Sequence, residues 1–387
     1  MTFRFQCEAV SAVLRDHEHP AKLDIRDTGA GWREKRKKSD GISERPADLS
    51  LLAPSDADEH KLSEKECKRS KVAGNRKPWA SKMTWNAVRI PIEIKTSQDQ
   101  QTPSYESYND GKTSRKARGR LAEYVAQVNI SQHRTFTLAV TIDRRNVYLT
   151  YWDPAGVVIA EPFDFITQPE KLFLFMYRVG QMSDTQLGYD PTVQRTEETD
   201  ADVQALRAFE PVLPHHKKYL AEAFPGASQW PVHRVEIKDK EEKKHTFLIG
   251  KNRHASQSAV GRGTRGYVAY DTEAKELRWL KDFWRPDTSD HTHEYDFYLQ
   301  LHEKGVSNIA TPVCGGDVCS PEEHMPQRTL AQEYLSAYQT PRIHHRIVVE
   351  EVCRSLEEYK NSRELCRVVY GAFCGKPSPT LIYTSPI

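Results

Sequence analysis

Three glycines and a valine in the second half of the chain have the spacing of a loop that could hold phosphate groups. They follow the order GxGxxGxV, as Gly261, Gly263, Gly266 and Val268. Glycines let a backbone arch closely over phosphates, and the valine of such a loop packs on an adenine ring. The same spacing occurs in ordinary tight turns, so the loop alone leaves both interpretations open.

A lysine and a glutamate follow the loop in the order that phosphate binding requires. Lys281 comes fifteen residues after Gly266, in the predicted strand LRWLKDF, where its amine would reach the α- and β-phosphates. Glu294 begins the inward face of the predicted helix HEYDFYLQLHEKG, which is the place for the partner of that lysine. The alternative is that both side chains form salt bridges on the surface.

A second set of residues could cleave phosphodiester bonds. Asp48, in the segment PAD, precedes Glu93 and Lys95, which share one face of a predicted strand. The set resembles the PD-(D/E)xK signature of restriction-endonuclease-like folds, in which two carboxylates hold Mg²⁺ and the lysine positions the attacking water. The alternative is a surface ion pair of Glu93 and Lys95, and Pro91 indicates an edge or bulge position for their strand.

Other residues of metal-ligand type do not form a recognisable site in the sequence. Cys314, Cys319 and His324 lack a second ligand pair, so no metal site is expected from them. Gly315 and Gly316, between the two cysteines, predict a turn between strands.

The elements that must position these side chains predict an α+β fold in two main parts. Residues 85–190 show the order strand, helix, strand, strand and predict an α/β leader domain, for which a restriction-endonuclease-like fold is one interpretation. Residues 229–372 predict a second domain of short strands and helices. Three further segments complete the predicted organisation. Residues 1–84 are expected to be largely disordered or inserted, although the Asp48 region could contribute a strand to the leader domain. Residues 191–228 are expected to form a helical connector and residues 373–387 an irregular tail.

Composition narrows the functional classes. A formal net charge of +2 gives no overall field for nucleic acid or membranes, so nucleic-acid binding would depend on local residues such as the Asp48 set. The sequence has no run of about 18 apolar residues, so no membrane contact is expected. Seven scattered cysteines without a CxxC pair favour reduced thiols and an intracellular location, cytoplasmic or nuclear.

Several segments resemble the fungal-type protein kinase family. They are FLIGKNRHASQSAVGRGTRGYVAYD, LRWLKDFWRP and GVSNIATPVCGGDV in the second half, and QHRTFTLAVTI and LTYWDPAGVVIAEPFDFI in the first. The resemblance covers roughly residues 85–370. It implies a protein-kinase-like fold, protein phosphorylation as the activity, and ATP with Mg²⁺ as the ligands. The implied ATP site consists of Gly261, Gly263, Gly266, Val268, Lys281 and Glu294.

Departures from the family pattern predict that this chain is catalytically incomplete. Residues 318–387 contain no aspartate, whereas a kinase needs one in its catalytic loop and another for Mg²⁺. His344-His345-Arg346 is followed by Ile347 instead of aspartate and predicts a strand. The expectation is a truncated member, with a small lobe that lacks most of the large lobe and acts as a pseudokinase-like binding or regulatory module. A protein partner would cover its exposed face.

One aromatic residue predicts weak nucleotide binding. Trp279 shares a strand face with Lys281, at the position where kinases of the VAIK type keep a small alanine against the adenine. An indole at this position would block the purine, so any ATP and Mg²⁺ binding is expected to be weak.

Overall fold

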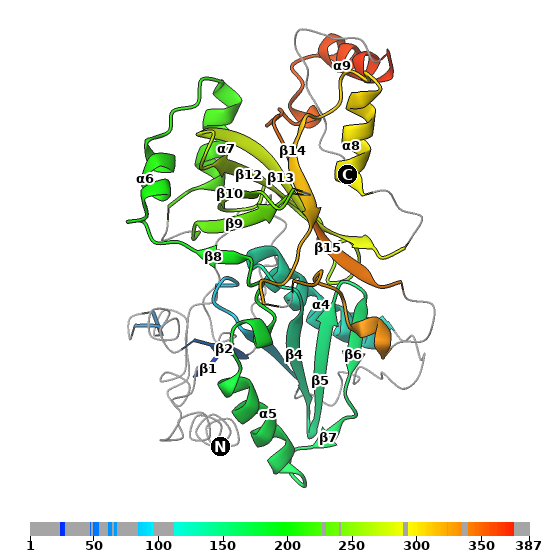
Figure 1. The fold of residues 1–387 in the computed structure, drawn as a ribbon. Helices are drawn as coiled ribbons and strands as arrows, with labels where there is room; N and C mark the ends of the chain where they lie inside the picture. Colours follow the sequence, from blue (N-terminus) through cyan, green and yellow to red (C-terminus); the bar gives the residue numbers. More distant parts are fainter. Residues whose placement is uncertain are drawn as a thin grey trace. The chain divides into compact units, whose positions relative to one another are not determined.

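The computed structural model shows two compact units, each of which is built on its own sheet (Figure 1). The first unit comprises Met1–Asp190, Ser256–Gly261 and Thr329–Gln339, and the second comprises Pro191–Ala255, Arg262–Arg328 and Thr340–Ile387. The structure describes residues 24–27, 47, 49–53, 61–63, 66–67, 84–95, 112–226, 230–239, 241–288, 293–322, 324–334 and 340–374. None of the helices in these ranges is long and apolar enough to cross a membrane.

The first unit contains a mixed sheet in the order β1-β2-β3-β4-β5-β6, with β7 paired to β5. Its strands are β1 (Asp24–Asp27), β2 (Leu49–Leu52), β3 (Ile90–Lys95), β4 (Thr137–Asp143), β5 (Asn146–Asp153), β6 (Gly156–Ile159) and β7 (Phe163–Asp164). β3 and β4 are parallel, and the other neighbouring pairs are antiparallel. A parallel pair requires a crossover, which α4 (Lys112–Ser131) supplies.

Both faces of this sheet are covered. Leu121, Val125 and Val128 of α4 pack with Ala139 and Trp152 on one face. On the other face, α5 (Pro169–Gln181) packs its apolar side chains against the isoleucines of β3. Two short 3₁₀ helices, η3 (Thr185–Leu187) and η4 (Ala331–Glu333), complete the described part of the unit. Central strands such as β3 are therefore buried on both sides.

The second unit contains an antiparallel sheet in the order β14-β15-β13-β12-β10-β9-β8, with β11 paired to β12. Its strands are β8 (Val193–Arg195), β9 (His233–Lys238), β10 (Lys244–Ile249), β11 (His254–Ala255), β12 (Arg265–Asp271), β13 (Glu276–Pro286), β14 (Pro312–Asp317) and β15 (Arg342–Val349). Gly316 of β14 lies so close to β9 that a Cβ added there would be 3.5 Å from the Lys238 carbonyl oxygen. Because these strands are not neighbours in the sheet order, the sheet must curl strongly.

Helices cover the face of β13 that carries Trp279 and Lys281. Val203 and Leu206 of α6 (Ala201–Ala208) and Tyr219 of α7 (Pro214–Ala223) pack in one cluster with Trp279. Tyr295 and Tyr298 of α8 (Glu294–Glu303) pack in another. The chain continues through η5 (Leu356–Glu358) to α9 (Ser362–Cys374). The opposite face of the sheet encloses its own apolar core around Phe247, Leu280 and Val348.

Most predicted elements of both parts are present, and the mixed α/β composition agrees with a kinase-like fold. Two local predictions are wrong. Pro91 does not mark an edge strand, because β3 lies between β2 and β4; the proline precedes the parallel ladder, which begins at Ile92. Gly315 and Gly316 do not form a turn but lie within β14. Gly315 is required there because a Cβ would lie 2.9 Å from the Arg346 carbonyl oxygen of β15 and 3.0 Å from the Tyr295 ring of α8.

Candidate nucleotide-binding site

Lys281 and Glu294 meet in the second unit as an ion pair between β13 and α8. Lys281 Nζ lies 2.8 Å from Glu294 Oε1 and 2.9 Å from Oε2, so the amine donates to both carboxylate oxygens. The lysine side chain is 8% exposed and the glutamate side chain 22% exposed. The pair therefore ties the helix to the middle of the sheet and keeps the ammonium group in a fixed place.

Further side chains around this pair give the site a positive excess. Arg262 Nη2 lies 3.9 Å from Glu294 Oε2, and its guanidinium lies 5.2 Å from the centroid of the Phe283 ring. Lys281 Nζ lies 4.9 Å from the same centroid. Two cations thus share one carboxylate, which leaves one positive charge for an anionic ligand. Sequence reasoning missed Arg262 and Phe283, although both lie close to residues that it named.

The predicted glycines occupy different environments. Gly263 and Gly261 both have positive φ, of 54° and 108°, as a tight loop requires. Gly261 belongs to the first unit, where its N–H donates to the Pro154 carbonyl oxygen at 2.8 Å. The site described here is therefore built from second-unit residues. Gly266 lies at the start of β12, where a Cβ would overlap the Trp279 indole.

The indole of Trp279 occupies the face on which an adenine was expected. Trp279 is paired with Val268 across β12 and β13, and both pack in the cluster beneath α6 and α7. Val268 is only 1% exposed. A purine could contact this valine only after the Trp279 side chain moved aside.

The histidine-rich segment near the end of the described chain lies in a strand and not in a catalytic loop. His344, His345 and Arg346 belong to β15 and are buried. His344 Nε2 donates to Asp282 Oδ1 at 3.0 Å, and Arg346 Nε donates to Asp282 Oδ2 at 2.9 Å. His344 and Arg346 therefore support the sheet.

Comparison with known proteins identifies the family. A family model described as fungal protein kinase matches residues 67–378, which is most of the chain. The chain belongs to the fungal protein kinase family. Neither the curated proteins nor the solved structures contain a match.

In this fungal kinase chain, the first unit brings Glu93 and Lys95 together on β3. Their side chains form an ion pair and are 1% and 4% exposed, so they are not the surface pair considered from the sequence. Arg120 of α4 also donates to Glu93 Oε1, at 2.9 Å. Asp48 lies outside the described residues, whereas Leu49, which follows it, is paired with Ile92, which precedes Glu93.

Two carboxylate oxygens near this pair lack a hydrogen bond within the described part of the chain. They are Glu93 Oε2 and Asp143 Oδ1, and both are buried. Asp143 is paired with Lys95 across β3 and β4. Sequence reasoning missed Asp143 and Arg120, because the parallel register and the helix crossover that bring them to Glu93 are not local features.

Sequence reasoning also missed a buried ionic cluster in the second unit. Asp282, which follows Lys281 but faces the other side of β13, accepts hydrogen bonds from Arg265 at 2.9 Å, His344 and Arg346. Burial alone would raise the pKa of Asp282, but the neighbouring positive charges of these three residues outweigh it and hold the pKa well below 3.8. The cluster is a structural ion network on the side of the sheet opposite the Lys281 site.

The thiols that were considered as metal ligands do not gather. Cys314 is buried, and burial raises the pKa of its thiol to about 12, whereas Cys319 is exposed. The described residues bring together a different set, His293, Asp317 and His345.

The protein partner that was expected to cover an exposed face of the second unit stays a prediction. Exposed apolar side chains of this unit include Phe297 of α8 and Val369 and Tyr370 of α9.

Proposed function

We propose that the second unit binds a nucleoside triphosphate through Lys281, as a pseudokinase-like module of the fungal protein kinase family. The observation that carries this proposal is the bidentate ion pair between Lys281 on a central strand and Glu294 at the start of a helix. Membership of the family supports ATP as the nucleotide and Mg²⁺ as its ion. Lys281 would contact phosphate oxygens while Glu294 holds its amine in place.

Phosphoryl transfer by this chain alone is not part of the proposal. A kinase positions the substrate hydroxyl with one aspartate and holds Mg²⁺ with another. No aspartate follows Asp317 in this sequence, and Asp317 itself is bonded to Arg285 and His345. The function proposed for the Lys281 site is therefore nucleotide binding.

A thermal-shift titration with ATP and Mg²⁺ tests the binding. The wild-type chain should show a saturable rise in Tm, because a ligand that binds only the native state stabilises it. Lys281→Ala should abolish the rise. Lys244→Ala is the matched control, since this lysine lies on β10, is 60% exposed and pairs with Glu236 on the surface. Equal shifts for both lysine variants would contradict the assignment of Lys281.

A variant of Trp279 distinguishes a nucleotide site that the indole obstructs from the absence of a nucleotide site. Trp279→Ala removes the indole that lies over Gly266 and next to Val268. If the indole limits entry of the base, this variant should bind ATP more tightly than the wild-type chain. A folded Trp279→Ala protein without any shift, together with an unresponsive wild type, would mean that the kinase resemblance reflects ancestry alone.

A second function is proposed for the first unit, namely Mg²⁺-dependent cleavage of nucleic acid. The specific observation is the arrangement of β2 antiparallel to β3, the α4 crossover and β4 parallel to β3, with Glu93 and Lys95 on β3. Glu93 Oε2 has no hydrogen-bond partner among the described residues, so it could accept a metal. This order of elements supports a restriction-endonuclease-like site completed by Asp48.

Cleavage assays on DNA and RNA test this second function. Activity should require Mg²⁺ and should be lost in Lys95→Ala while circular dichroism shows that the variant is folded. Arg145→Ala is the control, because Arg145 forms an exposed ion pair with Asp164 in the same unit. Intact nucleic acid after prolonged incubation with the wild-type chain would reject the nuclease and leave Glu93 and Lys95 as a buried structural pair.

A further inference from the structure

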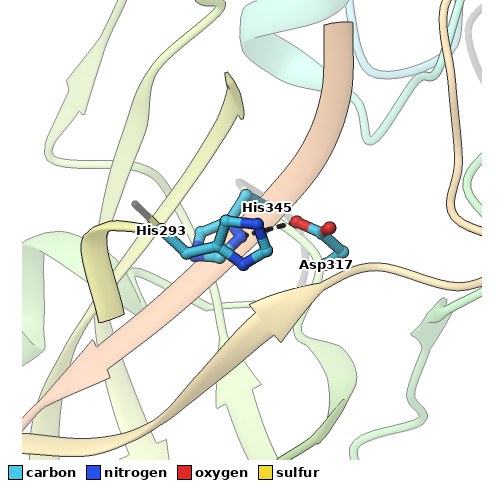
Figure 2. A group of neighbouring side chains, drawn as sticks. All are labelled: His293, Asp317 and His345. Carbon is cyan, nitrogen blue, oxygen red and sulfur yellow. Dashed lines mark hydrogen bonds and ion pairs between the residues drawn. The ribbon is translucent and has the colours of Figure 1, made fainter. Parts of the chain in front are cut away.

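A second group of side chains lies on the same face of the second unit as Lys281. His293 precedes α8, Asp317 ends β14 and His345 lies in β15 (Figure 2). His345 is paired with Phe283 of β13. One ring nitrogen from each histidine and one carboxylate oxygen of Asp317 lie within 4.8 Å of one another. Two imidazoles and a carboxylate are a ligand set that proteins use for zinc and similar ions.

We propose that His293, Asp317 and His345 bind a divalent transition metal ion of the Zn²⁺ class. This site is separate from any Mg²⁺ that accompanies a nucleotide at Lys281, because Mg²⁺ prefers oxygen ligands. Tetrahedral zinc places its ligand atoms roughly 3.3 Å apart. The three groups would therefore need to close in only modestly around the ion.

Each of the three side chains has unused capacity for a ligand. His345 is fully buried, and its Nδ1 lies 2.8 Å from Asp317 Oδ1. Its Nε2 has no hydrogen-bond partner in the described structure, so Nε2 can carry the ring proton and leave the lone pair of Nδ1 for an ion shared with Asp317. An ionised carboxylate offers about four lone-pair positions. Asp317 uses two of them for Arg285 Nε at 2.8 Å and Arg285 Nη2 at 2.5 Å, and the contact with His345 Nδ1 would give way to the ion.

His293 occupies the N-cap position of α8 without acting as a cap. No hydrogen bond from its side chain to the first turn is found in the described structure, and its ring centroid lies 5.7 Å from that of His345 in an edge-to-face arrangement.

Arg285 has two opposing effects on such a site. Its guanidinium fixes the Asp317 carboxylate from the side of β13, which orients a ligand before the ion arrives. Its positive charge also repels a cation, and this repulsion lowers the affinity. The half-exposed His293 leaves the site open for entry of the ion and for a water ligand.

Metal binding here would act on the nucleotide site through α8. His293 is directly followed by Glu294, the partner of Lys281. An ion shared by His293, β14 and β15 would fix the start of the helix and thereby hold Glu294 against Lys281. The metal site thus supplies a means to regulate the Lys281 site, although its existence does not depend on nucleotide binding.

Isothermal titration of the metal-free full-length chain with ZnCl₂, and a parallel titration with Co²⁺ followed by its visible absorption, test the proposal. The wild-type chain should bind one more ion than His293→Gln, or bind it at least about tenfold more tightly. His302→Gln is the matched control, because His302 is an exposed histidine of the same helix that contacts the Ala310 carbonyl oxygen. Identical isotherms for wild type and His293→Gln would overturn the site.

Two further variants keep the test decisive. Asp317→Asn should weaken the same binding event. Lys281→Ala should still bind the ion, with at most a modest loss of affinity because coupling between two sites is reciprocal, and this separates the metal site from the nucleotide site. Hydrogen exchange of the α8 amides should slow on addition of Zn²⁺ in the wild type and not in His293→Gln. Zn²⁺ binding that survives both His293→Gln and Asp317→Asn would place the ion elsewhere and reject the proposal.

Discussion

Each unit contains an ion pair between a glutamate and a lysine of a central strand, but the two pairs are built differently. Glu93 and Lys95 lie on one strand, two residues apart, and both are almost completely buried. Lys281 and Glu294 join a strand to a helix, and the glutamate side chain is 22% exposed. The first pair depends only on the local strand, whereas the second exists only when α8 is in place.

This difference separates a pair that is fixed from one that can be switched. Removing one partner from a buried pair leaves an uncompensated charge in a medium of low polarity, which is costly. At the Lys281 pair, water reaches the glutamate side chain, so separating the two charges costs less. The Lys281 pair therefore suits a site that changes its contacts when a ligand binds, and the Glu93 pair suits a site whose geometry is fixed before any ligand binds.

If burial determines how much stability is lost when a carboxylate is replaced, the largest loss is expected for Asp282. Asp282→Asn leaves Arg265, His344 and Arg346 facing one another without a counter-charge. We expect a loss of about 3–5 kcal/mol in the free energy of unfolding, measured with urea at pH 7. A loss below about 1 kcal/mol would mean that burial does not decide the cost.

The same residue predicts a pH dependence. The pKa of Asp282 in the folded chain is well below 3.8, and the pKa of an aspartate in an unfolded chain is about 3.9. A depressed pKa stabilises the fold fully above the unfolded value, and this contribution is lost as the pH falls below about 4. Unfolding curves between neutral and acidic pH should therefore show a steeper acid loss for the wild type than for Asp282→Asn.

The next largest effect is expected at Glu93. Glu93→Gln keeps the size of the side chain but leaves Lys95 buried without its counter-ion and removes the charge that Arg120 contacts. We expect a loss of about 3 kcal/mol in the free energy of unfolding of the first unit. Arg145→Ala, in the exposed pair with Asp164, should change it by less than about 1 kcal/mol. Equal losses for the two variants would remove the distinction between the pairs.

A third effect concerns the wall of the nucleotide site. Gly266→Ala puts a methyl group into the Trp279 indole, and such overpacking costs about 1–3 kcal/mol. The cost should disappear in a Trp279→Ala background, which a double-mutant cycle measures. Gly371→Ala in α9 is the control, because a Cβ there has no atom within 4 Å, so helix propensity should raise stability by about 0.5–1 kcal/mol. An additive cycle would show that the indole does not occupy the space above Gly266.

Local patterns were sufficient to predict much of the fold and the Lys281 pair. Alternation of apolar residues predicts β13, and the helical spacing after it predicts α8 with Glu294 at its start. A lysine on the inward face of the strand and a carboxylate at the beginning of the next helix are then expected to lie close together. Their contact could therefore be inferred before any distance was known.

Pairings between distant segments could not be inferred in this way. Asp282 meets Arg346 only because β13 pairs with β15 in one particular register, and sixty-four residues separate the two positions. His293, Asp317 and His345 likewise come from three elements and share no local motif. Gly315 resembles a turn residue in sequence, and only the close approach of the Arg346 carbonyl oxygen and the Tyr295 ring shows why a strand needs a glycine there.

The smallest change in stability, and the sharpest test of the comparison, is expected at Glu294. Glu294→Gln removes the charge of a carboxylate that is 22% exposed, and water that reaches this position can solvate the Lys281 ammonium, so the free energy of unfolding should fall by about 1 kcal/mol or less. The start of α8 should nevertheless lose its tether to β13. Amide hydrogen exchange in the first turn of α8 should therefore speed up while exchange in the sheet stays unchanged. A large loss of global stability would instead show that Lys281 and Glu294 form a fixed structural pair, like Glu93 and Lys95.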